Sequence, residues 1–561
     1  MRFFKTLTVL TVCASLAVPS AGAFAQLSGG VGQFNLPSLG NVAGADLTVM
    51  EERDLGEQLM RRVRADRSYL ADPEITDFLN RLGYRLLAAA DPSPYDFFFF
   101  PIRDKTLNAF ALPGGFIAVH SGLLVAAQTE SELAGVMSHE IGHVTQRHIA
   151  RMIENSKGSL AMTIGSILLA ILAARAGGSS GGDAAMGVML GTQAAMLSKQ
   201  LGYSRDAERE ADRFGLSTLE RAGFDPHGME DFFERLQKNN RWYETTSTAY
   251  VSTHPMTSER MSDMQNRTRS LAPVVHRDSL DFFLVKARAR VLQETAYDGW
   301  LKAAKSFENE LEKKPSGYAL TAAQYGLAVA RSKMNQKDRA LTAARAAKAS
   351  VKEKSVIVDK LLSELAYEAA KTDADRAKAV ELARSTAAAY PYSALAVSNC
   401  VELLYRSGRH EELVRYLRSQ KAMPHSNPDY YMYLARSYEA MGKKSLAYAA
   451  TGDMYALLNN PQAAVYQFEL AQKADDADFY VMSEIDAKLR EMRLKVLEQK
   501  NGQREQKSPF CPIQTAPALC ENTPRISDGP NARRARAGPA RAALPQGPSG
   551  APFLLNAHYE H

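Results

Sequence analysis

Cysteine, net charge and long apolar segments are all scarce in this sequence, and each shortage excludes a class of protein. Four cysteines among 561 residues are too few for the disulfide framework of small exported domains, and their spacing fits no metal site. A net charge of +6 gives no reason to expect a nucleic-acid partner. The apolar runs at residues 7–18 and 159–174 are short for a membrane span.

The first 25 residues have the pattern of a cleaved signal peptide. Arg2 and Lys5 form a positive start, the apolar run at 7–18 follows, and Ala-Phe-Ala at 23–25 precedes a cut before Gln26. An uncleaved membrane anchor is the alternative, but the run is too short to span a bilayer comfortably. We therefore expect an exported protein.

Length and composition divide the rest of the chain. It is too long for one core, and its 45% apolar and 23% charged residues are those of an ordinary globular protein. Residues 26–45, rich in Gly, Ser and Asn, predict a flexible leader. Residues 501–561 hold nine of the 24 prolines and predict a disordered tail. Between them we expect two domains, at 46–275 and 279–495.

The first domain, residues 46–275, is predicted to combine helices with a small sheet. Capping signals predict helices over about 48–64 and 72–90, and a third that begins after Thr129. The expected fold class is therefore mainly α with a small β-sheet. Aromatic and β-branched runs predict its strands at 95–102, 108–112 and 116–120.

The third of these helices carries the motif His139-Glu140-Ile141-Gly142-His143. Positions four apart lie on one face of a helix, so both imidazoles can reach one metal ion, and Glu140 can take a proton from water beside them. A catalytic zinc needs a third protein ligand and an open position. A structural zinc is the weaker alternative, because structural sites usually use closed sets of cysteine and histidine.

The residues alone leave the third ligand open. On the helix predicted at 205–212, Glu208 could bind the metal, and Asp212, one turn later, could accept a hydrogen bond from a ligand histidine. Glu210 competes for the ligand role. A solvated, charged helix face is the alternative for the whole segment.

An HExxH motif followed about 65 residues later by ExxAD resembles the gluzincin peptidase family that includes HtpX and the β-barrel assembly-enhancing proteases (BepA). The stretches 108–115 and 223–226, and the sequence Ser-Thr-His-Pro at 252–255 followed by Arg260, extend this resemblance over about 46–270. The resemblance implies a zincin-type metalloprotease domain that binds one Zn²⁺ per chain. Its implied ligands are His139, His143 and Glu208, with Glu140 as general base and Asp212 as a supporting catalytic residue.

Two further histidines need separate interpretations. In the periplasmic branch of this family, the histidine that matches His254 can take the fourth zinc position and hold the enzyme latent, and elsewhere in the family it steadies the transition state. A histidine fixed in a turn before Pro255 is the third interpretation. Arg260 is expected to be a supporting residue. We expect His148, which lacks ligand spacing, on the surface at the far side of the motif helix.

The second domain, residues 279–495, is predicted to be helical and repetitive. Three prolines, spaced 37 and 33 residues apart, accompany a predicted helix pair at 430–441 and 444–458. This unit resembles tetratricopeptide repeats, whose length is about 34 residues. A non-repeating helical bundle is the alternative.

The signal peptide and the helical repeats favour the periplasmic branch of the family. The resemblance then implies a zinc-dependent endopeptidase of the periplasm that degrades misassembled outer-membrane proteins and assists their assembly, with the outer-membrane assembly machinery as a further partner. The alternative is a chaperone or assembly scaffold that acts through the repeats and has a latent metal site. Residues 159–174 are expected to form a hairpin or lid, or else to contact a membrane peripherally. An extended substrate is expected to pair with the strand at 116–120.

Overall fold

The computed structural model describes residues 47–155, 204–242, 254, 257–272, 274–419 and 427–507. The expected signal peptide, the leader, the apolar segment 159–174 and the tail beyond residue 507 lie outside this part. The chain divides into two compact units, Met1–Val496 and Leu497–His561, and the features below belong to the first unit, apart from the end of the last helix. No helix of the described residues is both long enough and apolar enough to cross a membrane.

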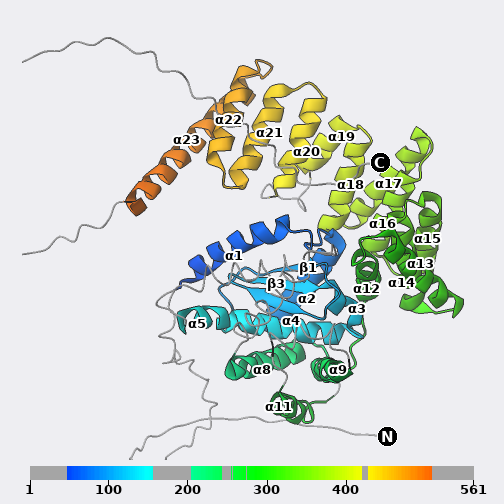
Figure 1. Cartoon of the computed structure of the whole chain (residues 1–561). Coiled ribbons are helices and arrows are strands. Elements are labelled where there is room, and N and C mark those ends of the chain that lie inside the picture. Colours follow the sequence, from blue (N-terminus) through cyan, green and yellow to red (C-terminus); the bar gives the residue numbers. More distant parts are fainter. Residues whose placement is uncertain are drawn as a thin grey trace, which may run out of the picture. The chain divides into compact units, whose positions relative to one another are not determined.

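Among the described residues, which are mainly helical, the strands form one three-stranded sheet (Figure 1), which confirms the predicted fold class. β3 lies in the middle of the sheet, parallel to β1 and antiparallel to β2. Because β3 is paired on both sides, it has no free backbone edge, and the expectation that a substrate pairs with it is wrong. The strands are β1 (Phe98–Ile102), β2 (Ala109–Leu112) and β3 (Phe116–His120).

Side chains alternate between the two faces of the sheet along each strand. Both faces carry buried apolar side chains here, and helices cover both of them. Phe100 and Phe116 pack in one cluster with Met60 of α1, whereas Phe99 and Ile117 belong to a larger cluster that includes α2 and α4. α1 and α4 therefore lie on opposite faces of the sheet (Figure 1). The helices of this region are α1 (Val49–Ala65), α2 (Pro73–Ala89), α3 (Ser121–Ala126), α4 (Glu130–Thr145), α5 (His148–Asn155), α8 (Arg205–Arg221), α9 (His227–Trp242) and α11 (Ser258–Thr268).

Capping residues determine where the predicted helices begin. Thr48 and Glu51 form a full capping box at the start of α1. At the start of α4, the side chain of Thr129 accepts a hydrogen bond from the backbone N–H of Glu132. The carboxylate of Glu132 instead accepts from the backbone N–H of Gln128, so only half of a capping box forms there. The α4 helix nevertheless begins where the sequence predicted.

Two glycines allow the motif helix α4 to cross α8 at short distance. A Cβ atom on Gly142 would lie 3.2 Å from the Cα atom of Ala211. On α8, a Cβ atom on Gly215 would lie 3.2 Å from the backbone nitrogen of His139. This close approach of the two helices brings the acidic side chains of α8 to the motif on α4.

The C-terminal part of the described chain is a succession of helices. Each helix from α13 to α22 packs against the next one along the chain, which is the packing pattern of a helical repeat array. α20 and α21 coincide with the predicted helix pair, and Gly442 at the turn between them has a φ of 73°. These helices are α12 (Leu280–Leu292), α13 (Tyr297–Glu312), α14 (Gly317–Lys333), α15 (Lys337–Ser350), α16 (Val356–Glu368), α17 (Asp373–Ala389), α18 (Ala394–Arg406), α19 (His410–Ser419), α20 (Pro428–Ala440), α21 (Lys444–Leu457), α22 (Pro461–Lys473) and α23 (Phe479–Lys507).

Buried charges join α2 to the helices that follow the sheet domain. Glu74 of α2, which is fully buried, lies 2.9 Å from Lys360 Nζ on α16 and 3.1 Å from Arg288 on α12. Burial alone would raise the pKa of Glu74, but the charges of Arg288 and Lys360 outweigh it and lower this pKa to about 2. The larger hydrophobic cluster also continues from α2 and α4 into α12 to α16. Packing is therefore continuous across residues 275–279.

Candidate metal centre

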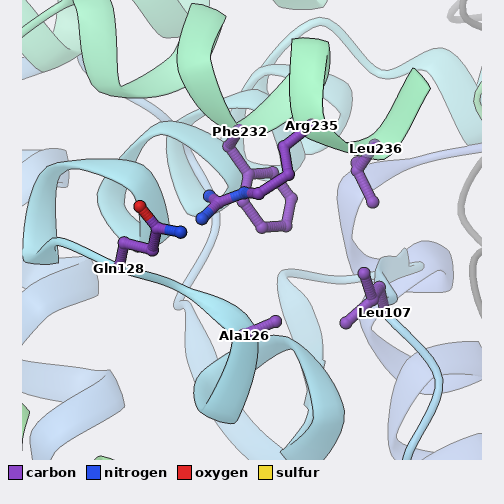
Figure 2. A pocket seen from close by; sticks show the side chains of 6 residues that line it. All are labelled: Leu107, Ala126, Gln128, Phe232, Arg235 and Leu236. Carbon is purple, nitrogen blue, oxygen red and sulfur yellow. The ribbon is translucent and has the colours of Figure 1, made fainter. Parts of the chain in front are cut away.

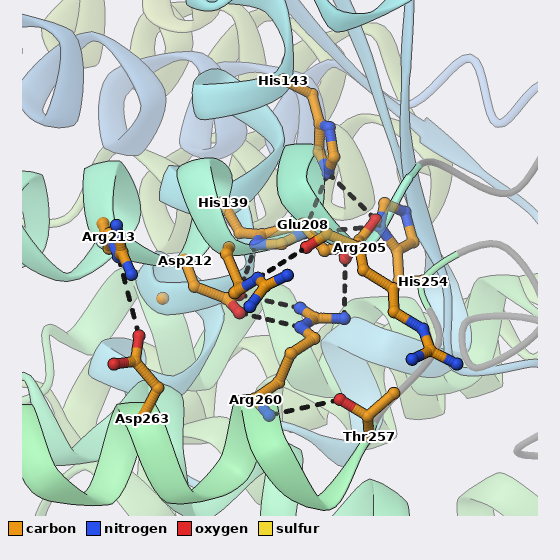
Figure 3. A network of polar contacts seen from close by, with 12 residues as sticks. His139, His143, Arg205, Glu208, Asp212, Arg213, His254, Thr257, Arg260 and Asp263 are labelled. Atoms are coloured by element: carbon orange, nitrogen blue, oxygen red, sulfur yellow. Dashed lines mark hydrogen bonds and ion pairs between the residues drawn. The ribbon is translucent and has the colours of Figure 1, made fainter.

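Side chains from three parts of the chain converge on one buried point (Figure 3). His139 and His143 come from α4, Glu208 comes from the first turn of α8, and His254 precedes α11. One nitrogen or oxygen atom of each residue lies within 4.8 Å of those of the other three, and none of the four residues is more than 1% exposed. The structure thus brings Glu208 and His254 to the motif histidines.

The distances between these donor atoms fit a single tetrahedral ion. His143 Nε2 lies 3.0 Å from His139 Nε2 and 3.6 Å from a Glu208 oxygen. His254 Nδ1 lies 3.3 Å from His139 Nε2 and 3.0 Å from Glu208 Oε1. Nitrogen or oxygen ligands at about 2.0–2.1 Å from zinc, placed at the corners of a tetrahedron, are separated by about 3.3 Å.

The outer ring nitrogens indicate which atoms face the centre of the cluster. His139 Nδ1 lies 3.0 Å from Asp212 Oδ1, and His143 Nδ1 lies 2.8 Å from His148 Nδ1. With a proton on each outer nitrogen, both Nε2 atoms direct lone pairs at the same point. Two lone pairs at 3.0 Å repel each other unless a cation lies between them. This donor set therefore fits zinc, which binds neutral imidazole nitrogen and carboxylate oxygen.

Arg260 holds the two carboxylates of α8 in place. Its Nε and Nη2 atoms each donate to one oxygen of Asp212 at 2.8 Å, and its Nη1 atom lies 2.7 Å from Glu208 Oε2 (Figure 3). Burial raises the pKa of Asp212, but hydrogen bonds from His139 and Arg260 outweigh it and lower this pKa below its ordinary value. Asp212 is therefore an ionised acceptor for the outer N–H of His139, which is the carboxylate–histidine pairing common at zinc sites.

The carboxylate of Glu140 lies beside the cluster and is fully buried. Its Oε1 atom lies 3.5 Å from His254 Nε2. Burial raises the pKa of Glu140 to about 7; His254 opposes this rise and Glu208 adds to it. A carboxyl group with a pKa near 7 can both accept and return a proton at neutral pH.

His254 contacts the metal-ligand candidates and the general-base candidate at the same time. Its Nδ1 atom faces His139 and Glu208, and its Nε2 atom faces Glu140. The ring is 1% exposed. His254 therefore occupies the space above the motif that a fourth ligand or a reacting group would need.

The prediction that His148 lies on the surface, on the far side of the motif helix, is wrong. α4 ends at Thr145, and Arg147 adopts a left-handed backbone with a φ of 55°. The helical phase of α4 therefore does not continue to His148, which starts α5 and turns its ring back toward His143. His148 is 3% exposed, and burial lowers its pKa to about 4.

Glu210, the competing ligand candidate, lies outside the donor cluster. Its Oε2 atom lies 2.9 Å from His148 Nε2 and 2.8 Å from Arg151 Nη2. Sequence reasoning missed this pair of contacts. The available signal was a third histidine, His148, five residues after His143. If the motif helix continued to this residue, its ring would point away from His143, so the signal was not used.

Two other features near α4 are distinct from the cluster. Glu130, His276 and Asp278 also lie close enough for a metal. There, Asp278 accepts from the backbone N–H of Glu130 and Glu130 accepts from the backbone N–H of Ser279, each at 2.8 Å. These carboxylates therefore cap the first turns of α4 and α12, which explains their proximity without a metal.

The second feature is a cavity of about 160 Å³ beside α9 (Figure 2). Phe232 lines the cavity, whereas the ring of the next residue, Phe233, lies edge-on to His139 with centroids 5.8 Å apart. The cavity and the donor cluster thus lie against different faces of α9. The cavity is lined by Leu107, Ala126, Gln128, Phe232, Arg235 and Leu236.

An HExxH helix, a carboxylate from a second helix and a buried set of nitrogen and oxygen donors define a zinc metallopeptidase. Residues 73–268 match peptidase family M48. The chain is 38% identical over 349 residues to a Vibrio cholerae protein assigned to the β-barrel assembly-enhancing proteases, covering 61% of this chain and 67% of that protein. It is 35% identical over 352 residues to the β-barrel assembly-enhancing protease of Escherichia coli K12, covering 60% and 67%. Metalloprotease LoiP of E. coli is 27% identical over 263 residues, covering 46% and 92%. The chain therefore belongs to peptidase family M48, and it is a zinc metalloendopeptidase.

Proposed function

We propose that His139, His143 and Glu208 hold one catalytic zinc ion and that Glu140 is the general base. The observation that carries this proposal is the convergence of the three donors in a buried cluster beside an equally buried carboxylate. Asp212 supports the site by orienting His139, and Arg260 supports it by holding Asp212 and Glu208.

When bound, zinc polarises the scissile carbonyl and makes nearby water more acidic. Glu140 takes a proton from the attacking water and delivers it to the leaving amine. The buried position of Glu140 suits this role, because its pKa of about 7 lets it exist in both protonation states at neutral pH. His139 and His143 keep their Nε2 lone pairs directed at the centre through their outer N–H groups.

An extended substrate pairs its backbone with β2, which is an edge strand of the sheet. His120 N–H donates to Asn108 C=O, so alternate residues of β2 direct their backbone groups to β3. Ala109 and Ala111 direct theirs to the opposite edge, with which no strand of the described residues pairs. The backbone N–H of Ala111 is close enough to Glu140 to lower the pKa of its carboxyl group, which places this edge beside the general base. An extended peptide therefore adds to β2 as a further strand.

Replacing Ala109 by Pro removes one N–H group from the edge of β2 that faces away from β3. The value of KM for a peptide substrate is expected to rise by about 2–10-fold, which corresponds to the loss of one hydrogen bond. Ala109→Gly, which keeps the N–H, is the control, and melting temperatures show whether each variant is folded. A folded Ala109→Pro variant with unchanged KM would contradict pairing at β2.

We infer that His254 would fill the fourth ligand position of a bound zinc ion and so keep the resting protease latent. Its contacts to His139, Glu208 and Glu140 support this assignment, because a group that fills the fourth position must leave before a substrate can bind. Activation then requires movement of the segment that carries His254.

The proposed domain organisation and site of action are supported by the sequence pattern and by the names of the relatives. Residues 46–275 form the peptidase domain and residues 279–495 form a tetratricopeptide-like binding domain, following a signal peptide at 1–25 and a leader at 26–45. The protein acts in the periplasm on misassembled outer-membrane proteins and assists assembly together with the outer-membrane assembly machinery. The names of the relatives and the repeat-like packing of α13 to α22 support this role over that of a scaffold with a silent metal site. Clearance of such proteins by the wild type but not by Glu140→Gln tests it.

The metal assignment is tested by the zinc content of the purified chain. Wild-type protein is expected to hold one zinc ion. Loss of a residue that only supports a ligand typically lowers metal affinity by roughly 10–100-fold. Because Glu208 is a candidate ligand itself, Glu208→Ala is expected to lower zinc affinity by at least as much. The matched control is Glu220→Ala, which removes an exposed carboxylate from the same helix. A Glu208→Ala variant that binds zinc as tightly as the control would remove Glu208 from the ligand set.

A further inference from the structure

The two motif histidines are supported in different ways. His139 Nδ1 contacts the carboxylate of Asp212 directly at 3.0 Å. His143 Nδ1 contacts a second imidazole, His148 Nδ1, at 2.8 Å, and the other nitrogen of His148 contacts Glu210 Oε2 at 2.9 Å. A chain of three side chains thus leads from the donor cluster to a carboxylate that is 46% exposed.

The hydrogen-bonding capacity of each ring assigns the protons along this chain. A histidine that offers the Nε2 lone pair to a metal carries its proton on Nδ1. His143 therefore donates from Nδ1, and His148 Nδ1 must be the acceptor. The proton of His148 then lies on Nε2, where it is donated to Glu210.

We propose that His148 and Glu210 are positioning residues that hold His143 in the tautomer and orientation that zinc binding requires. This inference rests on the proposed assignment of His143 as a zinc ligand. Glu210 fixes the tautomer of His148, and His148 in turn fixes the tautomer of His143.

The backbone and the neighbouring charges match this role. The left-handed backbone of Arg147 turns the chain immediately before His148 and so directs the ring at His143. Arg151 donates to Glu210 at 2.8 Å and to the backbone carbonyl of Gln146 at 2.7 Å. Glu210 is thereby held in place at the end of α4, although almost half of its side chain is in contact with solvent.

α8 therefore supports both motif histidines. Asp212 acts on His139 directly, and Glu210, two residues earlier on the same helix, acts on His143 through His148. Glu208 of that helix supplies the candidate ligand itself. A displacement of α8 relative to α4 would disturb the candidate ligand Glu208 together with the supporting contacts of both histidines.

The test compares His148→Leu with His148→Gln in the full-length chain. Zinc dissociation constants are measured by competition with a chelator, and ¹⁵N chemical shifts of the histidine rings report the tautomer of His143. Leu removes the acceptor, and zinc affinity is expected to fall by roughly 10–100-fold. Gln can accept from His143 and donate to Glu210, so it is expected to restore most of the affinity. Asp206→Asn, at an exposed position on α8, is the control, and melting temperatures of the zinc-free proteins show whether each variant is folded.

Each outcome has a distinct meaning. Wild-type zinc affinity in a folded His148→Leu variant, or an unchanged Nδ1–H tautomer of His143 in the zinc-free form of that variant, overturns the positioning role. Equal losses in the Leu and Gln variants also overturn it, because only packing would then matter. If the wild-type chain itself binds no zinc, the metal assignment fails, and the positioning role fails with it.

Discussion

Replacing Glu140 by Gln is expected to lower the rate of peptide cleavage by about 10²–10⁴-fold, the usual contribution of a general base. Gln has nearly the same size and keeps the hydrogen-bonding oxygen, but it cannot take a proton from water. Zinc content is expected to stay at the wild-type level, because Glu140 is not in the donor cluster. Cleavage of casein and zinc content are measured on the same preparations.

The control for this variant is Asp206→Asn, which removes one carboxylate at a position whose side chain is 85% exposed. In cells, Glu140→Gln is expected to let misassembled outer-membrane proteins accumulate while the chain remains folded. Cleavage at the wild-type rate by the Glu140→Gln protein would exclude Glu140 as the base. Full function of that variant in cells would favour the scaffold alternative.

Replacing His254 by Ala is expected to raise the rate of peptide cleavage by roughly 5–150-fold, the range of a coupling free energy of about 1–3 kcal/mol. His254 lies within 3.5 Å of Glu140 and within 3.3 Å of His139 in the closed site. The smaller side chain leaves the fourth position open to the substrate carbonyl and to water. The measurement is cleavage of casein and of a short peptide at equal zinc content.

The opposite result for His254→Ala has an equally definite meaning. A fall in the cleavage rate with zinc retained would show that His254 assists the transition state, which is the other interpretation that the sequence resemblance offers. His227→Ala is the matched control, because His227 is a partly exposed histidine of the same domain that bonds Asp225 outside the cluster. No change relative to this control would leave His254 as a structural residue.

The parts of the fold that rest on local chemistry could be predicted from the sequence. Thr48 and Thr129 signal helix starts because their hydroxyl groups accept hydrogen bonds from the first turn. The HExxH helix followed from the apolar spacing after Thr129. The strand at 116–120 has the predicted bounds, whereas β1 begins only at Phe98, since aromatic residues favour strands without marking where pairing starts.

Features that depend on how distant segments meet could not be predicted in this way. The middle position of β3 is a property of strand order, which the periodicity of one strand does not contain. Glu208 and Glu210 have the same chemistry, and only the close crossing of α4 and α8 places Glu208 in the donor cluster. His148 was misplaced because a single left-handed residue, Arg147, changes the helical phase, and an arginine gives little sign of that conformation.

The most direct measurement of the central claim is an anomalous-difference map, recorded at the zinc absorption edge from a crystal of the purified chain. We predict one strong peak about 2.0–2.1 Å from His139 Nε2, His143 Nε2 and a carboxylate oxygen of Glu208, with His254 or a solvent molecule in the fourth position. The absence of a peak at this position in zinc-containing crystals, or a peak held by other residues, would contradict the account.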